Sequence, residues 1–330
     1  MSLAPRAVIV HRTTEYEELL ARHGTHGQAE FFLSSRGRSI REVAERHRRS
    51  VRALAAVSAA VPPQWRRARV ERADLDRFLF APEDVVVVAG QDGLVANTAK
   101  YLAGQPVVGI DTDPGRNTGV LVRHRPDETG RLLRAAVARG AAAEELTMVE
   151  AVADDTQRLV ALNEIYLGRP DHQTSRYRLD LDGPGTPVAA GPKGPKGPAG
   201  VAAGGGSDGG DGSAEGGGGE VQASSGVLVG TGTGATGWLR SLWRERGGSR
   251  PLPAPAEARL LWFVREAWPS PATGTSLVEG DLTAGRRLRV TVESDRLVAF
   301  GDGMESDALE LTWGQSVRVG VSDTSLRLLV

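Results

Sequence analysis

The sequence predicts an α/β domain, with a parallel sheet flanked by helices, followed by a β-rich domain. In the first half, short apolar runs alternate with segments of helical periodicity, as expected when helices join parallel strands. After about Leu146, helical periods nearly disappear and short β-type runs follow one another with turn residues between them. A length of 330 residues is enough for two ordinary domains. We therefore expect domains at residues 1–146 and 147–330.

Local signals locate the elements of the first domain. Thr14 followed by Glu17, and Ser39 followed by Glu42, each predict a capping box at the start of a helix. The uninterrupted apolar run at 84–89 is typical of a strand buried on both faces. The other expected elements are strands at 7–10, 68–71 and 106–111 and helices at 15–22, 40–61, 94–102 and 127–139.

The second domain is expected to consist of strands, with one short helix near 237–246. The expected strands are 148–152, 159–167, 177–181, 226–230, 260–264, 287–292, 297–300, 309–311, 316–321 and 325–330. Residues 183–221 are of low complexity, with Gly-Pro-Lys triplets and then long Gly runs. The triplets are too few for a collagen helix, so we expect a flexible insertion between two strands.

Composition excludes several classes of protein. The net charge of −1 gives no indication of a nucleic-acid or membrane partner, and no apolar run is long enough to span a bilayer. With no Cys, thiolate catalysis, disulfides and Cys-ligated metals are excluded. The N-terminus has the pattern of a first strand rather than of a signal peptide, so we expect a cytoplasmic protein.

The segment Gly90-Gln91-Asp92-Gly93 is the clearest candidate site. It joins the buried strand to a helix, where Gly allows a ligand close to the backbone and the helix N-terminus favours phosphate. Ligands of open α/β sheets bind at this edge. The alternative is structural, since an acidic residue in the first turn of a helix also stabilises the helix dipole.

Three later segments are further candidates. Asn163 and Glu164 place an amide beside a carboxylate, a pair that can both donate and accept hydrogen bonds; the alternative is a polar pair at the end of a strand. The Gly/Thr-rich loop at 230–238 offers backbone N–H groups and hydroxyls to phosphate, although many such loops are only turns. Asp302 lies between two glycines and has a tight hairpin turn as its alternative. Asp111 and Asp113 fit a cation site or, with Pro114 and Gly115, a simple turn; we favour the turn.

Taken together, these segments resemble the NAD kinase family, in particular its mitochondrial-type branch and that branch's bacterial relatives. Residues 90–93 resemble the GGDG motif of this family. Collinear matches continue at 11–20, 107–119, 162–183 and 224–238 (the last SSGVLVGTGTGATGW). The fold implied is that of the NAD kinase and diacylglycerol kinase-like proteins. In it, the C-terminal domain is β-sandwich-like and the last stretch of chain returns to the first domain.

The resemblance implies transfer of the γ-phosphoryl group of ATP to the 2′-hydroxyl of the adenosine ribose of NAD. Asp92 would be the catalytic base, and Mg²⁺ would be held mainly by ATP rather than by protein ligands. A homodimer is also implied. The residues implied to bind NAD are Gly93, Asn163, Glu164, Thr233, Thr236, Trp238, Ser241 and Asp302. Those implied to bind ATP phosphates are Gly90, Gln91, Gly230, Thr231, Gly232 and Gly234.

Two departures from the family pattern leave alternatives open. Gln91 replaces the second Gly of GGDG, and Ala235-Thr236 replaces a Ser-Lys pair, so one cationic phosphate contact is lost or supplied by an Arg such as Arg240. A related kinase of the diacylglycerol or sphingosine type shares the GGDG motif and the two-domain fold. A non-catalytic nucleotide-binding regulator is the other alternative, favoured by both departures.

Overall fold

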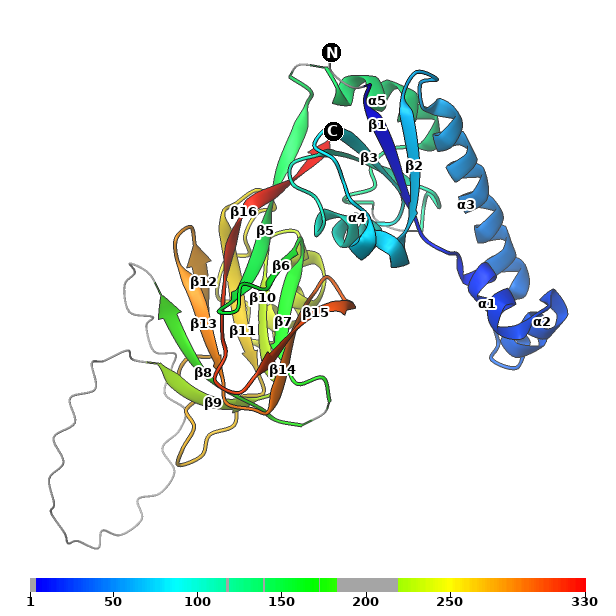
Figure 1. Ribbon diagram of the computed structural model, residues 1–330. Coiled ribbons are helices and arrows are strands. Elements are labelled where there is room, and N and C mark those ends of the chain that lie inside the picture. The colour runs from blue at the N-terminus through cyan, green and yellow to red at the C-terminus, as the bar shows by residue number, and fades with distance from the viewer. Residues whose placement is uncertain (1–3, 117–118, 139, 172, 183–218) are drawn as a thin grey trace, which may run out of the picture.

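The protein combines an α/β domain with a β-rich domain, as the sequence predicts (Figure 1). The computed structural model describes residues 4–116, 119–138, 140–171, 173–182 and 219–330. The elements of the first domain are β1 (Arg6–His11), α1 (Glu15–His23), α2 (His26–Ser34), α3 (Ile40–Ala60), β2 (Arg66–Glu71), η1 (Arg72–Arg77), β3 (Asp84–Gly90), α4 (Asp92–Ala99), β4 (Pro106–Asp111), η2 (Pro126–Glu128) and α5 (Thr129–Ala136).

The elements of the second domain are mostly strands. They are β5 (Ala143–Ala153), β6 (Arg158–Ala161), β7 (Glu164–Gly168), β8 (Ser175–Asp182), β9 (Glu220–Ser224), β10 (Gly226–Gly230), η3 (Gly234–Thr236), α6 (Trp238–Glu245), β11 (Arg259–Arg265), β12 (Glu279–Thr283), β13 (Arg287–Val292), β14 (Arg296–Gly301), β15 (Met304–Thr312) and β16 (Ser316–Leu329).

The first domain is built on the parallel strands β2-β1-β3-β4. Residues of β3 alternate between two cores, one shared with α3 and α5 and the other with α4. This accounts for the continuous apolar run, because a strand covered on both faces needs apolar side chains in both directions. The strand begins at Asp84, whose buried carboxylate accepts from Arg6 Nε (2.7 Å).

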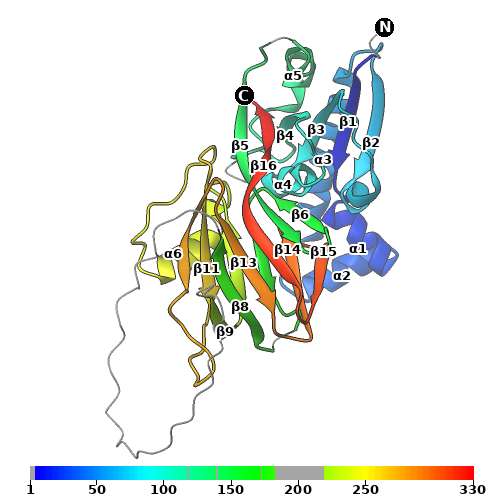
Figure 2. The same cartoon turned by 60° about the vertical axis from the view of Figure 1, so that its left-hand side comes forward.

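The final strand joins the two domains into one sheet. β16 pairs in parallel with β4 at Arg327 and Leu328, antiparallel with β5 along most of its length, and antiparallel with β13 at residues 316–320. Figure 2 shows β16 running from the second domain to the edge of the first. We expected two strands at 316–321 and 325–330, but they form one strand with a register shift between Val321 and Ser325. The expected return of the chain to the first domain is confirmed.

The second domain is a pair of packed sheets. The six-stranded antiparallel sheet, in the order β12-β11-β10-β7-β14-β15, faces the part of the ten-stranded sheet that contains β16, β13, β8 and β9. Its core between the sheets includes fully buried Tyr177 and Trp262. The predicted boundary at residue 146 lies inside β5, a continuous strand that begins beside the first domain and ends in the second.

Several expectations about local structure were wrong. The expected strand 159–167 is two strands, β6 and β7, because the chain turns at Asn163 and the two pair with different neighbours. Ser39 begins α3 but makes no side-chain cap bond, whereas the capping box of Thr14 and Glu17 is present. The sequence analysis did not include α2, β9 or β12. Within the described residues, no helix is long and apolar enough to cross a membrane.

Shortening the predicted insertion is expected to leave the fold intact. Residues 183–218 lie outside the described residues, and β9 begins at Glu220, so the last two predicted insertion residues are strand. On either side, β8 and β9 pair from Ser175↔Ser224 to Leu179↔Glu220. A variant with 188–214 removed keeps this pairing, and closure entropy changes little with loop length. We expect a melting temperature within about 2 °C of the full chain. A fall of 10 °C would show that the insertion contributes to the fold.

Candidate functional site

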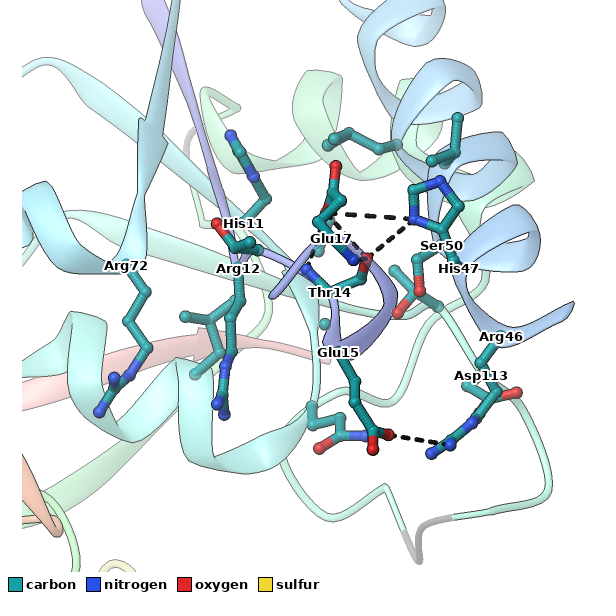
Figure 3. Close-up of a pocket in the computed structure, with 18 of the residues that line it drawn as sticks. His11, Arg12, Thr14, Glu15, Glu17, Arg46, His47, Ser50, Arg72 and Asp113 are labelled. Carbon is teal, nitrogen blue, oxygen red and sulfur yellow. Dashed lines mark hydrogen bonds and ion pairs between the residues drawn. The ribbon is translucent and has the colours of Figure 1, made fainter. Parts of the chain in front are cut away.

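A cavity of about 1230 Å³ opens at the carboxyl ends of the parallel strands. Its walls come from the turn after β1, from α3, from the turn between β3 and α4, and from the β14–β15 hairpin of the second domain. Figure 3 shows one wall, where Thr14 Oγ1 lies 2.8 Å from His47 Nδ1 and Glu15 pairs with Arg46 (3.0 Å). This is the sheet edge at which open α/β folds bind ligands.

The GQDG turn forms part of this cavity. Gly90, Gln91 and Gly93 line it, and Gln91 is the N-cap of α4. A Cβ at Gly93 would meet no atom within 4 Å, whereas one at Gly90 would lie 2.9 Å from a methyl carbon of Leu94. The turn therefore presents the N-terminus of α4 toward open space, which favours an anionic ligand.

The carboxylate of Asp92, the expected base, accepts hydrogen bonds from the protein backbone. Its Oδ1 accepts from the backbone N–H of Leu121 (2.8 Å) and Val122 (2.9 Å), and its Oδ2 from that of Val120 (2.9 Å). It is not among the residues that line the cavity. The same segment crosses β4 at Gly109, where a Cβ would lie 2.1 Å from Leu121 O. In this conformation Asp92 holds residues 120–122 against the sheet edge.

Within the described part of the chain, five arginines line the cavity, together with five carboxylates: Glu15, Glu17, Glu18, Asp113 and Asp302. Arg12, Arg69, Arg72 and Arg116 line it, together with Arg46. Arg72 Nε donates to Asn97 Oδ1 (2.7 Å), and Arg12 lies 3.8 Å from Glu18. Among the described residues, neither Arg69 nor Arg116 has an ion-pair partner. Guanidinium groups without tight carboxylate partners are suited to bind phosphate oxygens.

The carboxylate of Asp113 forms a salt bridge with Arg49. Its Oδ1 accepts from Arg49 Nε (2.8 Å), and its N–H donates to Asp111 Oδ1 (2.8 Å). The turn that we favoured over a cation site is thus stabilised by an aspartate–backbone bond. No group of three or more potential metal ligands occurs among the residues that the structure describes.

Asp302 joins the cavity to the second domain. It lines the cavity, and its Oδ1 and Oδ2 accept from the backbone N–H groups of Asn163 (2.7 Å) and Leu162 (2.8 Å). Its carbonyl accepts from Asn97 Nδ2 of α4 (2.9 Å). It lies in a tight hairpin with φ +54°, a conformation that Asp tolerates better than most residues. The hairpin alternative is therefore correct, and the same residue also faces the cavity.

A buried ion pair fixes this hairpin to α4. Lys100 Nζ donates to Gly301 O (3.2 Å) and to Asp307 Oδ1 (2.7 Å), and Tyr101 Oη donates to Asp307 Oδ2 (2.6 Å). Burial, followed by the hydrogen bond to Asp307, raises the pKa of Tyr101. The helix that carries the GQDG turn and the hairpin that carries Asp302 are thus held together at several points.

The Gly/Thr-rich loop lies against Asn163 and is mostly buried. Thr231 donates from N to Asn163 O (2.9 Å) and from Oγ1 to Leu162 O (2.5 Å). A Cβ at Gly234 would lie 2.3 Å from Asn163 O, and one at Gly232 would lie 2.2 Å from Ala254 O. These glycines therefore permit close packing. The buried Thr233 Oγ1 has no hydrogen-bond partner within the described residues.

Three aromatic rings lie beside this loop on the outer face of the six-stranded sheet: Tyr166, which is buried, and Trp238 and Phe300, which are partly buried. Trp238 stacks on Tyr166, with ring centroids 5.4 Å apart and ring planes at 22°. Phe300 lies on β14, which pairs with β7, and its ring centroid is 5.2 Å from that of Tyr166. Thr236 and Ser241 are exposed near this cluster at the start of α6. Such rings can accommodate a planar base by stacking.

Glu164 begins β7 next to Asp302. Its carbonyl accepts from Asp302 N (3.1 Å), while its carboxylate accepts no hydrogen bond from any described residue. Burial, and then the negative charge of Asp302, raises the pKa of Glu164 to about 7. Burial also raises the pKa of Asp302 to about 6, although backbone N–H groups and Lys100 oppose the shift.

The structure therefore arranges the sequence-predicted residues in two linked groups. Gly90, Gln91 and Gly93 line the cavity, whereas Asn163, Glu164, the Gly/Thr loop and Trp238 cluster at the ends of β7 and β10. Asp302 lines the cavity with the first group and hydrogen-bonds to Asn163 of the second. Gly230 continues β10 and is buried. The sequence analysis missed the cavity arginines, although Arg12 directly follows β1, where side chains of this fold reach the ligand edge.

No protein-family model matches this chain, and no curated protein is significantly similar to it.

Removing the Glu164 charge should stabilise the fold at high pH. Because the folded pKa is raised from 4.5 to about 7, ionisation opposes folding, and this cost appears as pH rises from about 4.5 to about 7. We compare the free energy of unfolding of Glu164→Gln with that of wild type. The difference in favour of the variant should be larger at pH 8 than at pH 5, by about 2 kcal/mol. Urea unfolding at both pH values measures this difference. The control is Glu310→Gln, which removes an exposed carboxylate of the same domain. An equal effect of Glu164→Gln on stability at both pH values would contradict the raised pKa of Glu164.

Proposed function

We propose that this protein is an NAD kinase, which transfers the γ-phosphoryl group of ATP to the adenosine 2′-hydroxyl of NAD. The observation that carries the proposal is one hydrogen-bonded chain through four segments far apart in the sequence. It runs from α4 through Asn97 to Asp302, from Asp302 to Asn163, and from Asn163 to Thr231. These bonds bring the four segments together at one place in the fold, as a shared nucleotide site requires.

The acceptor nucleotide has a matching environment in the second domain. The partly exposed ring of Trp238, which is backed by the buried ring of Tyr166, is the aromatic surface offered to adenine. Glu164 and the buried Thr233 have polar atoms without described protein partners. A ribose carries hydroxyls that both donate and accept, so a carboxylate and a threonine hydroxyl suit it. The surface that would recognise NAD is thus mainly that of β7, the Gly/Thr loop and α6.

The donor phosphates would be bound by the arginines of the cavity. The N-terminus of α4 contributes its backbone dipole, and Arg12, Arg69 and Arg72 contribute positive charge. Phosphoryl transfer depends on positioning and charge neutralisation more than on covalent chemistry, so these groups supply the main requirement. Mg²⁺ would enter bound to the ATP phosphates, and Asp113 would not be free to bind it because it is paired with Arg49.

A non-catalytic nucleotide-binding regulator is the second candidate. The hydrogen bonds of Asp92 favour this candidate, because both carboxylate oxygens of the expected base accept from backbone N–H groups. A regulator would bind NAD and ATP in the same places without transferring phosphate. The two candidates therefore differ in turnover and not in binding.

The deciding experiment is an assay for NADP formed from NAD, ATP and Mg²⁺, read with an NADP-specific dehydrogenase. We expect NADP only when all three components are present, and phosphate at the 2′ position of the product by mass spectrometry and NMR. Calorimetric binding of NAD and ATP with no detectable NADP would support the regulator instead. Binding of neither nucleotide would contradict both candidates.

The arginine assignment is tested by Arg12→Gln and Arg69→Gln. Loss of one charge-assisted phosphate contact, worth roughly 1.5–3 kcal/mol, should raise KM for ATP about 10- to 100-fold. KM for NAD should stay within about twofold, because these side chains belong to the cavity wall of the first domain. Arg41→Gln, on the exposed part of α3, is the matched control. An increase in KM for NAD alone would place the acceptor in this cavity.

A further inference from the structure

One hydrogen-bonded chain joins a cavity arginine to the hairpin of the second domain. Arg72 begins η1, directly after β2, and its side chain extends along the cavity wall (Figure 3). Its Nε donates to Asn97 Oδ1 (2.7 Å), and Asn97 Nδ2 donates to the carbonyl of Asp302 (2.9 Å). Asn97 is buried and lies one helical turn beyond Gly93 on α4. The chain therefore runs from the cavity, through α4, to the residue that holds the backbone at 162–164.

The polarity of this chain determines the orientation of the Asn97 amide. A guanidinium group can only donate hydrogen bonds, and a backbone carbonyl can only accept them. One orientation of the amide, with its oxygen toward Arg72 and its nitrogen toward Asp302, satisfies both neighbours. The reversed orientation would place two donors together at one end and two acceptors together at the other. Arg72 thus selects the orientation in which Asn97 supports the hairpin.

The other hydrogen bonds between α4 and this hairpin do not reach the cavity. Lys100 Nζ donates to Gly301 O and to Asp307, and Tyr101 Oη also donates to Asp307. None of these four residues lines the cavity, whereas Asn97 does. Within the parts of the chain that the structure describes, Asn97 is the residue of α4 that bonds both to a cavity arginine and to the hairpin.

Arg72 keeps N–H groups that a ligand can use. Its bond to Asn97 occupies Nε, and the described residues provide no other hydrogen-bond or ion-pair partner for its guanidinium group. The side chain is only partly buried, so it retains conformational freedom when no ligand is bound. Phosphate oxygens that accept from its terminal nitrogens would restrict this freedom and hold Nε against Asn97.

We propose that Asn97 couples the two nucleotide sites, so that ATP and NAD each bind more tightly when the other is present. This inference rests on the proposed NAD kinase function, which assigns the donor to the cavity and the acceptor to the group that includes 162–164. Phosphate bound to Arg72 holds the Asn97 amide, and the amide holds Asp302. NAD then meets a backbone that is already ordered, and it binds at a smaller cost in conformational entropy. Asn97 is a positioning residue, because it acts through Arg72 and Asp302.

The test measures this coupling by titration calorimetry of the full chain. The Kd for NAD is determined with and without a saturating non-hydrolysable ATP analogue and Mg²⁺, and the ratio of the two Kd values is the coupling factor. For wild type we expect a factor of about 5 to 10, at the lower end of the range typical of coupled sites. Titration of the analogue with and without NAD should give the same factor, because coupling between binding sites is reciprocal.

Variants of Asn97 interrupt the chain at different bonds. Asn97→Leu has a similar size but removes both hydrogen bonds, whereas Asn97→Asp keeps an acceptor for Arg72 and places an oxygen against the carbonyl of Asp302. Each should bring the coupling factor to within about twofold of unity, with both nucleotides still bound. Arg72→Met should do the same and also weaken the analogue. Combining Arg72→Met with Asn97→Leu should lower the factor no further, because both act through one chain.

Two controls separate this effect from a general loss of stability or of charge. Gln105 is another buried amide that bridges two backbone groups, since it accepts from Ala103 N and donates to Ala81 O, and it does not line the cavity. Gln105→Glu should lower the melting temperature but keep the wild-type coupling factor. Arg77→Gln removes an exposed guanidinium group from η1, the element that carries Arg72, and should also keep this factor.

Three results would overturn the inference while leaving the proposed function standing. In the first, wild type binds both nucleotides with a coupling factor near unity. In the second, Asn97→Leu keeps the wild-type factor. In the third, Gln105→Glu loses the factor as Asn97→Leu does, so that coupling follows general stability. Failure of wild type to bind either NAD or the ATP analogue would instead contradict the proposed function itself.

Discussion

The hydrogen bonds of Asp302 are the constraint on which the arrangement of the site depends. A single residue in a tight hairpin fixes the chain at Leu162–Glu164 through its carboxylate and fixes α4 through its carbonyl. Backbone N–H groups that lost this carboxylate would be left without partners in a partly buried position, at a cost of about 1–3 kcal/mol each. The position of the GQDG turn relative to Glu164 is therefore determined by the second domain as much as by the first.

The glycines of the Gly/Thr loop also fix the arrangement of the site. Gly234 and Gly232 let backbone approach backbone, and the loop is thereby placed over Asn163 with no side chain between them. The consequence for function is indirect: beside this loop, the hydroxyl of Thr233 and the carboxylate of Glu164 have no hydrogen-bond partner among the described residues. In the same way, Gly109 allows the segment held by Asp92 to cross β4.

The sequence predicted the parts of the fold that local signals determine. The buried run of β3 and the capping box of α1 follow from residues that are neighbours in the chain. The division of 159–167 into two strands could not be predicted in this way, because it depends on Asp302, about 140 residues away. Continuity of β16 across the two domains likewise depends on pairing with β4 and β5. The sequence motifs identified the residues of the candidate site. They could not show which carboxylates, such as Asp92, accept hydrogen bonds from the backbone, because tertiary contacts determine this.

The central claim is that both domains contribute to one nucleotide site through Asp302. Hydrogen–deuterium exchange of the full chain, with and without NAD plus a non-hydrolysable ATP analogue, tests it directly. The account predicts that exchange slows together at the GQDG turn (90–93), at 162–166 and in the hairpin at 301–303. Slowing confined to one domain, or only at surfaces remote from Asp302, would contradict it.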